Sequence, residues 1–192
     1  MTQTLGLPEI IRNGIDTATL FATLDAVEAQ PEIAVFRFRA SNRWIGGAHN
    51  RSVIKDFYAA CAEDTSRTAA FALDTGEPSI LLGTDTGPNP AEYLLHALAA
   101  CVTTSLVYSA AARGVRLTAV SSELEGEMDL RGALGISDDH RNGFSKITMK
   151  VTVSGDAPPE KLAQVVERGR RRSAVYDVVT NGVPVELDVV VE

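Results

Sequence analysis

Residues 83–114, GTDTGPNPAEYLLHALAACVTTSLVYSAAARG, carry the strongest structural signal in the chain. A loop rich in Gly, Pro and Asp leads into a long segment dominated by Ala and Leu. Asn89 suits the N-cap of a helix and Pro90 suits its first position. Glu92 stands where a capping-box carboxylate reaches back to the cap, and the final glycine suits a helix end. The pattern therefore predicts one long helix over residues 90–113.

Cys101 lies near the middle of this predicted helix. Free cysteine is among the most buried residue types, so packing inside a helix of Ala and Leu is one interpretation. A reactive thiolate needs a lowered pKa, which a helix N-terminus or a nearby cation supplies. Cys101 is about three turns into its own helix, beyond the reach of that helix's dipole. A chemical role would thus require a cation from elsewhere in the fold, most simply an arginine.

Shorter elements are predicted before the long helix. Apolar residues at helical spacing over residues 7–29 predict two short helices separated by NGID. Alternating apolar and basic residues in IAVFRFRAS predict a strand, and RWIGGAHNRSVIKDF is its expected hairpin partner, with a bend near Gly46 and Gly47. TAAFALD suggests a third strand and SILLG a short edge strand.

The segments after the long helix alternate clearly. VRLTAVSSELEGEMDL and FSKITMKVTVSG should pair as two strands, and APPEKLAQVVERGRRR predicts a second long helix. SAVYDVVTNG is a shorter element and VPVELDVVVE a closing strand. These elements predict an α+β fold with helices packed against a sheet. We expect a helical N-terminal extension at residues 1–32 and one domain at residues 33–192.

The composition excludes several classes of function. The 192 residues carry a net charge of −7, which opposes nucleic acid or an anionic membrane as a partner. No segment has the length of continuous apolar residues that a membrane span needs, and two cysteines make no disulfide framework. We expect a cytoplasmic protein without cofactor. The scattered histidines, His49, His96 and His140, support no metal site, and RGRRRS at residues 168–173 is interpreted as solvated charge at a helix end.

The block GPNPAEYLLHALAAC, followed by EKLAQVVERGRRRSAVYDVVTNGVPVELDV, resembles the osmotically inducible protein C (OsmC) family, which includes the organic hydroperoxide resistance proteins. The likeness covers about residues 34–192. It implies an OsmC-like fold, in which antiparallel sheets pack around two long central helices in an intertwined homodimer.

The resemblance also implies a thiol peroxidase. In active members a cysteine on the central helix attacks the O–O bond of an organic hydroperoxide, an arginine and a glutamate activate it, and a second cysteine then forms a disulfide with it. Cys101 matches the attacking cysteine. Ala91 stands at the glutamate position, Ala48 at the arginine position and Ser173 at the position of the second cysteine.

Other residues could take the missing roles. Glu92 is displaced by one residue from the family's glutamate, and Arg39 and Arg51 lie near the family's arginine position, together with Arg37, Arg43 and His49. Ser105 or Tyr108 could add polarity beside the thiol. Cys61 is interpreted as a bystander.

Two hypotheses follow for the function. The leading one is a peroxidase that reduces organic hydroperoxides through Cys101 alone and is recycled by an external thiol reductant. The alternative is a non-catalytic homodimer that binds a small apolar molecule in its interface cleft, with Cys101 as packing. The reason for this alternative is that Ala48, Ala91 and Ser173 replace the arginine, the glutamate and the second cysteine of active members.

Overall fold

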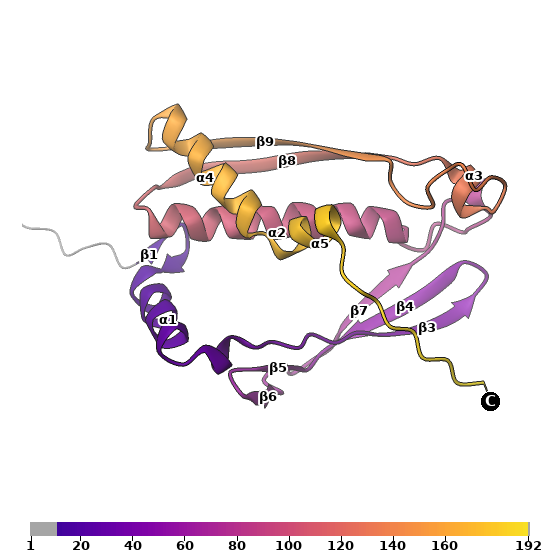
Figure 1. Cartoon of the computed structure of the whole chain (residues 1–192), viewed down its shortest axis with the longest axis horizontal. Coiled ribbons are helices and arrows are strands. Elements are labelled where there is room, and N and C mark those ends of the chain that lie inside the picture. The colour runs from indigo at the N-terminus through magenta and orange to yellow at the C-terminus, as the bar shows by residue number, and fades with distance from the viewer. Residues whose placement is uncertain (1–10, 192) are drawn as a thin grey trace, which may run out of the picture. The chain divides into compact units, whose positions relative to one another are not determined.

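The computed structural model describes residues 11–191 and has the predicted α+β organisation (Figure 1). The chain divides into two compact units. One unit comprises residues 16–94, and the other comprises residues 95–191 together with residues 11–15. We name them the 16–94 unit and the 95–191 unit and describe each by itself.

The 16–94 unit contains a three-stranded antiparallel sheet in the order β3-β4-β7. β3 (Ser41–Gly46) and β4 (His49–Ile54) form a hairpin that turns at Gly46 and Gly47, where a bend was predicted, and β7 (Phe71–Thr75) pairs with the other edge of β4. The predicted strand IAVFRFRAS is wrong in its position, because the chain enters the sheet only at Ser41. Upstream, Arg37 makes a single bridge to Tyr58.

Smaller elements complete the 16–94 unit. β5 (Phe57–Ala59) and β6 (Ala62–Asp64) form a second hairpin, and α1 (Thr17–Ala29) is capped by the Asp16 carboxylate. Two short 3₁₀ helices are η1 (Pro31–Ala34) and η2 (Ser79–Leu81). The predicted edge strand SILLG is therefore wrong. A left-handed backbone at Leu82 (φ 63°) ends η2 and is incompatible with a strand.

The long helix α2 (Pro90–Ala112) confirms the central prediction. Gly114 takes the left-handed conformation (φ 71°) expected after a helix end, and the Val115 amide donates to Ala110 O at 2.9 Å. By length and composition alone, α2 could cross a membrane. Such a helix is equally typical of a protein core. Its buried residues are Leu98, Val102, Leu106, Ala110 and Ala111.

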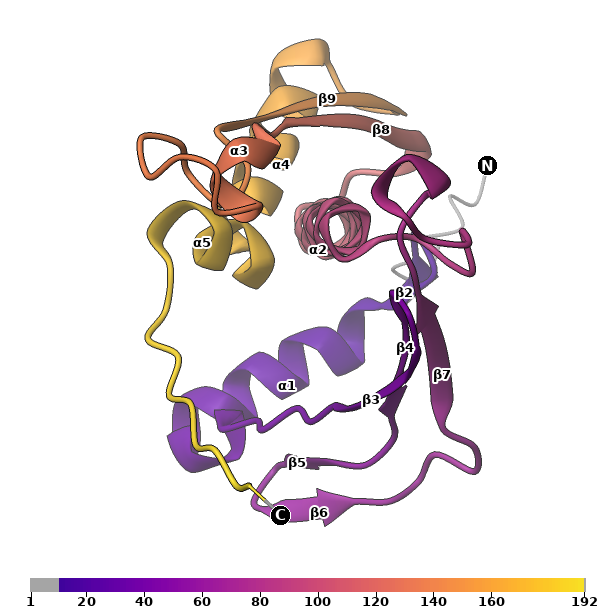
Figure 2. The ribbon, with the colours of Figure 1, turned by 90° about the vertical axis from the view of Figure 1, so that its right-hand side faces the viewer.

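The 95–191 unit packs a long hairpin and a second helix against α2 (Figures 1 and 2). β8 (Leu117–Glu127) and β9 (Lys146–Gly155) pair over their full length, and α4 (Pro159–Arg172) lies beside them. Short helices α3 (Leu130–Ala133) and α5 (Ala174–Asn181) follow β8 and α4. The core cluster joins these elements; its fully buried members are Leu106, Ala110, Val115 and Val165.

The contact between α4 and α2 depends on Gly169. A Cβ atom at this position would lie 2.7 Å from Leu106 Cα and 2.8 Å from Leu106 Cβ. Only glycine allows the two helices this approach, because the obstructing atoms belong mostly to the α2 backbone. Beyond this contact, α4 leads directly into the short helix α5.

The N-terminal region differs from the prediction. The expected helix before NGID falls partly outside the described residues, and the described part is a two-stranded hairpin of β1 (Ile11–Arg12) and β2 (Ile15–Asp16). Asn13 and Gly14 form its turn with positive φ, a strong hairpin signal that competes with helical spacing. The Asn13 side chain bonds Val115 O and the Leu117 amide, each at 2.9 Å. The turn thereby fixes the connection between α2 and β8.

The predicted C-terminal strand does not form in the single chain. Residues 182–191 have no regular secondary structure, although their apolar residues alternate as in a strand. Val185 and Leu187 are 86% and 87% exposed. A strand needs a neighbouring edge for its backbone hydrogen bonds, and none is paired with this segment among the described residues.

Candidate functional site

Cys101 projects from the middle of α2 and is partly accessible to solvent. The groups that interact with its sulfur come from its own helix and from the junction between α4 and α5. They are the Ser173 and Ser105 hydroxyls and the backbone N–H groups of Ala174 and Val175. The sulfur is therefore at the N-terminus of α5, where unpaired amides point outward.

Ser173 holds this junction in place. It is the N-cap of α5, its hydroxyl accepts a hydrogen bond from the Tyr176 amide at 3.1 Å, and only 2% of the residue is exposed. The preceding residue is tied back to α2, because the Ser105 hydroxyl donates to Arg172 O at 3.4 Å. The thiol thus faces polar groups whose positions are set by these hydrogen bonds.

The pKa of Cys101 is lowered from the ordinary thiol value. Burial by itself raises this pKa, because it penalises the charged form. The opposing contributions are larger in sum, chiefly the hydrogen bonds from Ser173 and from the Val175 and Ala174 amides, which stabilise the thiolate. The result is a thiol that ionises more readily than an isolated cysteine.

The source of this shift differs from the expectation that activation needs an arginine. A helix N-terminus is the other recognised way to lower a cysteine pKa. The N-terminus concerned belongs to α5, not to the helix that carries the thiol. The sequence alone indicates the dipole of α2, but it does not reveal that a second helix, about seventy residues downstream, lies against Cys101. The one sequence signal for this proximity is Ser173 itself, because it stands at the position of the family's second cysteine, which forms a disulfide with the attacking cysteine.

Glu92 is engaged in a complete capping box. The Glu92 amide donates to Asn89 Oδ1 and the Asn89 amide donates to Glu92 Oε2, both at 2.8 Å. These bonds explain the residue structurally, as the sequence predicted. Its catalytic role stays a prediction.

Arg39 and Arg51, the two arginines proposed as helpers, lie in the 16–94 unit and are both ion-paired. Arg39 makes a two-pronged contact to Glu63, with both N···O distances 2.7 Å. Arg51 bonds Asp74 through Nε at 2.8 Å and Nη2 at 3.1 Å. The Arg51 hydrogen bonds, and then a 2.7 Å contact from His49, lower the pKa of Asp74. A catalytic role of either arginine stays a prediction.

Cys61 lies in the tight turn between β5 and β6 and is exposed. It and Ala60 both have positive φ. Among the described residues, no group of three or more His, Cys, Asp or Glu side chains could hold a metal ion.

The family model for OsmC-like proteins matches residues 83–188, more than half of the sequence. The chain belongs to the OsmC family. The matched region contains both sides of the thiol site, since it includes Cys101 and Ser173. No curated protein matches the chain significantly.

Solved structures agree on the OsmC-like fold. An OsmC-like protein from Mycoplasma pneumoniae is similar with a TM-score of 0.58 at 12% identity, over 76% of this chain and 88% of that one. An organic hydroperoxide resistance protein from Legionella pneumophila has a TM-score of 0.54 at 15% identity, over 78% of this chain and 93% of that one. At such identities the likeness shows the fold alone.

Proposed function

We propose that the protein is a one-cysteine peroxidase that reduces organic hydroperoxides through Cys101. The observation that carries the proposal is the placement of the thiol at the N-terminus of α5, which lowers its pKa. The hydroperoxide resistance protein among the similar structures supports the substrate class at the level of the family.

The proposed reaction begins with the Cys101 thiolate. Its sulfur attacks one peroxide oxygen, so that an S–O bond forms as the O–O bond breaks. The departing alkoxide takes a proton and leaves as the alcohol, and the cysteine becomes a sulfenic acid. The amides of Ala174 and Val175 would stabilise the anionic sulfur before the attack.

Recycling would use an external thiol. Ser173 occupies the position of the family's second cysteine, and a hydroxyl cannot form a disulfide. One external thiol would condense with the sulfenic acid, releasing water and leaving a mixed disulfide. A second thiol would then release Cys101 and form the oxidised reductant.

The direct test is mass spectrometry of the reduced Cys61→Ser variant after one equivalent of cumene hydroperoxide. We expect one oxygen on Cys101 within seconds, trapped by dimedone. Cys101→Ser is the negative control, and Thr104→Ala, an exposed change on the same helix, is the matched control that keeps the rate. A Cys101 that stays reduced over many minutes would favour the alternative, a small apolar ligand and a packing thiol.

We further propose that the working form is an intertwined homodimer in the cytoplasm, with residues 33–192 as the OsmC-like domain and residues 1–32 as an extension. The support is the large apolar exposure of the single chain. Phe38 and Trp44 are 74% and 71% exposed, and residues 182–191 alternate like a strand without an edge. Light scattering at low concentration tests the dimer directly.

A further inference from the structure

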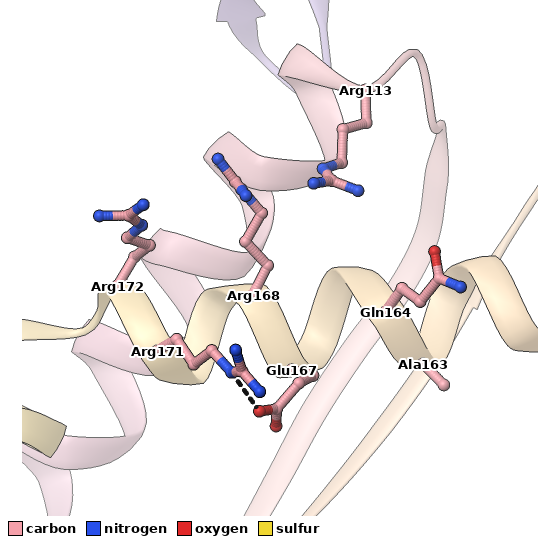
Figure 3. A pocket seen from close by; sticks show the side chains of 7 residues that line it. All are labelled: Arg113, Ala163, Gln164, Glu167, Arg168, Arg171 and Arg172. Atoms are coloured by element: carbon pink, nitrogen blue, oxygen red, sulfur yellow. Dashed lines mark hydrogen bonds and ion pairs between the residues drawn. The ribbon is translucent and has the colours of Figure 1, made fainter.

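The surface of α4 beside the end of α2 contains an open hollow of about 870 Å³. Arginine dominates its lining, in a chain whose net charge is −7. Figure 3 shows Gln164, Arg168 and Arg172 extending from α4 toward the side on which Arg113 descends from α2. Cys101 does not line this hollow. The full lining is Arg113, Ala163, Gln164, Glu167, Arg168, Arg171 and Arg172.

The charges at the hollow do not cancel. Glu167 is its only carboxylate, and it is already bound by two arginines: Arg170 through contacts of 2.6 and 2.8 Å and Arg171 through one of 2.7 Å. The hydrogen bonds from Arg170, then those from Arg171, lower the pKa of Glu167 to about 2. Glu167 is therefore ionised at neutral pH, and its negative charge is already compensated by these two arginines. Within residues 11–191 no carboxylate pairs with Arg113, Arg168 or Arg172.

The arrangement of these three guanidinium groups is set by the fold. Gln164, Arg168 and Arg172 succeed one another at intervals of four residues and so form one stripe on α4. Val165 and Gly169, both buried, lie on the adjacent face of α4, and Gly169 approaches α2 closely. Arg113 directly follows the last residue of α2. The dipoles of α4 and α2 favour cations at their ends, but do not require them to converge on one hollow.

We propose that this hollow binds a small molecule carrying two or more phosphate or carboxylate groups. Like charges at four-residue spacing repel one another, and a multivalent anion relieves that repulsion. Guanidinium groups bind such oxygens through paired N–H donors, and Gln164 adds a neutral donor. The volume lies in the range of small-molecule sites, and the acidic remainder of the chain opposes a nucleic acid.

Isothermal titration calorimetry of the full chain with inorganic pyrophosphate tests the site. We expect saturable binding that weakens as salt is added, since the contacts are exposed. Citrate in a parallel titration shows whether carboxylates are accepted as well as phosphates. Arg168→Gln and Arg113→Gln should each weaken binding about tenfold, the effect of one charge-assisted hydrogen-bonding group.

Lys161→Gln is the matched control, because it removes the same charge from an exposed position on α4 outside the hollow. This control should change the affinity by no more than about twofold, because it alters only the long-range electrostatic potential, which salt screens. Circular dichroism confirms that each variant is folded. The proposal is overturned if pyrophosphate and citrate both fail to bind, or if Lys161→Gln weakens binding as much as Arg168→Gln does.

Discussion

The two compact units of this chain differ most in what they bury. Every buried hydrophobic residue that the structure describes, from Leu98 to Val165, belongs to the 95–191 unit. The 16–94 unit buries Thr17 and Thr75 but none of its large apolar side chains. Phe21, Phe38, Trp44 and Phe71 are all about half exposed or more.

This difference shows which part of the chain has an apolar core of its own. Burial of apolar area is the main favourable contribution to folding, at roughly 25 cal/mol per Å². The 95–191 unit obtains it internally, through α2, α4 and the β8–β9 hairpin. The 16–94 unit has a well-paired sheet but no core of its own, which supports a second copy as the proposed source of its burial.

The largest expected effect comes from a charge on an apolar side chain of the 16–94 unit. Phe38→Asp should destabilise the proposed dimer by about 2 to 4 kcal/mol and yield monomer, because it buries an unpaired carboxylate at the interface. Light scattering and chemical denaturation measure both effects. Thr118→Asp, an exposed change on β8, is the control. A dimer unaffected by Phe38→Asp would contradict the burial of Phe38 at the dimer interface.

A second substitution tests the core of the 95–191 unit. Gly169→Ala should cost about 3 kcal/mol of unfolding free energy, because its Cβ would overlap the α2 backbone at Leu106. Gly46→Ala is the matched control, since its Cβ would meet no atom within 4 Å. Urea denaturation compares the two. Equal losses of unfolding free energy in the two variants would show that the contact between α4 and α2 tolerates a side chain at position 169.

The thiol site provides a prediction about pH. Ser173→Ala removes a hydrogen bond that lowers the pKa of Cys101, so that pKa should rise. Alkylation of the Cys61→Ser background by iodoacetamide reports the thiolate. Below both pKa values the variant should be alkylated several-fold more slowly than its parent, because less of its thiol is ionised, and above both pKa values the two rates should converge. An unchanged profile would contradict the assignment of Ser173.

Replacing the same residue by cysteine gives an independent check. In the Ser173→Cys variant, hydroperoxide should produce a disulfide between Cys101 and the introduced thiol, visible by mass spectrometry as a loss of two hydrogen atoms. Persistence of the sulfenic acid instead would show that the two positions are too far apart for a bridge.

The smallest effects are expected at the start of α2. Asn89→Ala should cost about 1 kcal/mol, the usual value of an N-cap. Glu92→Gln keeps a side-chain oxygen for the Asn89 amide and should leave both stability and peroxidase rate within about twofold. A large loss of rate in Glu92→Gln would give this residue the catalytic role that its displaced position leaves open.

The sequence predicted the helices and the long hairpin because their signals are local. Asn89, Pro90 and Gly114 define α2 through capping and turn chemistry, and β8 and β9 have a regular two-residue alternation. It misjudged one segment where two local signals compete and another where a strand needs a distant partner. Asn13 and Gly14 favour a hairpin turn over helical spacing, and residues 182–191 alternate like a strand but lack an edge to join.

The sequence by itself determined the family, the long central helix and the position of Cys101 within it. Only the tertiary structure decided which groups lower the pKa of that thiol. Its pKa depends on groups at Ser173, Ala174 and Val175, far away along the chain, and the close packing of α4 on α2 at Gly169 brings them near. Capping and periodicity act over a few residues, whereas the field at one sulfur atom depends on every group that the fold places around it.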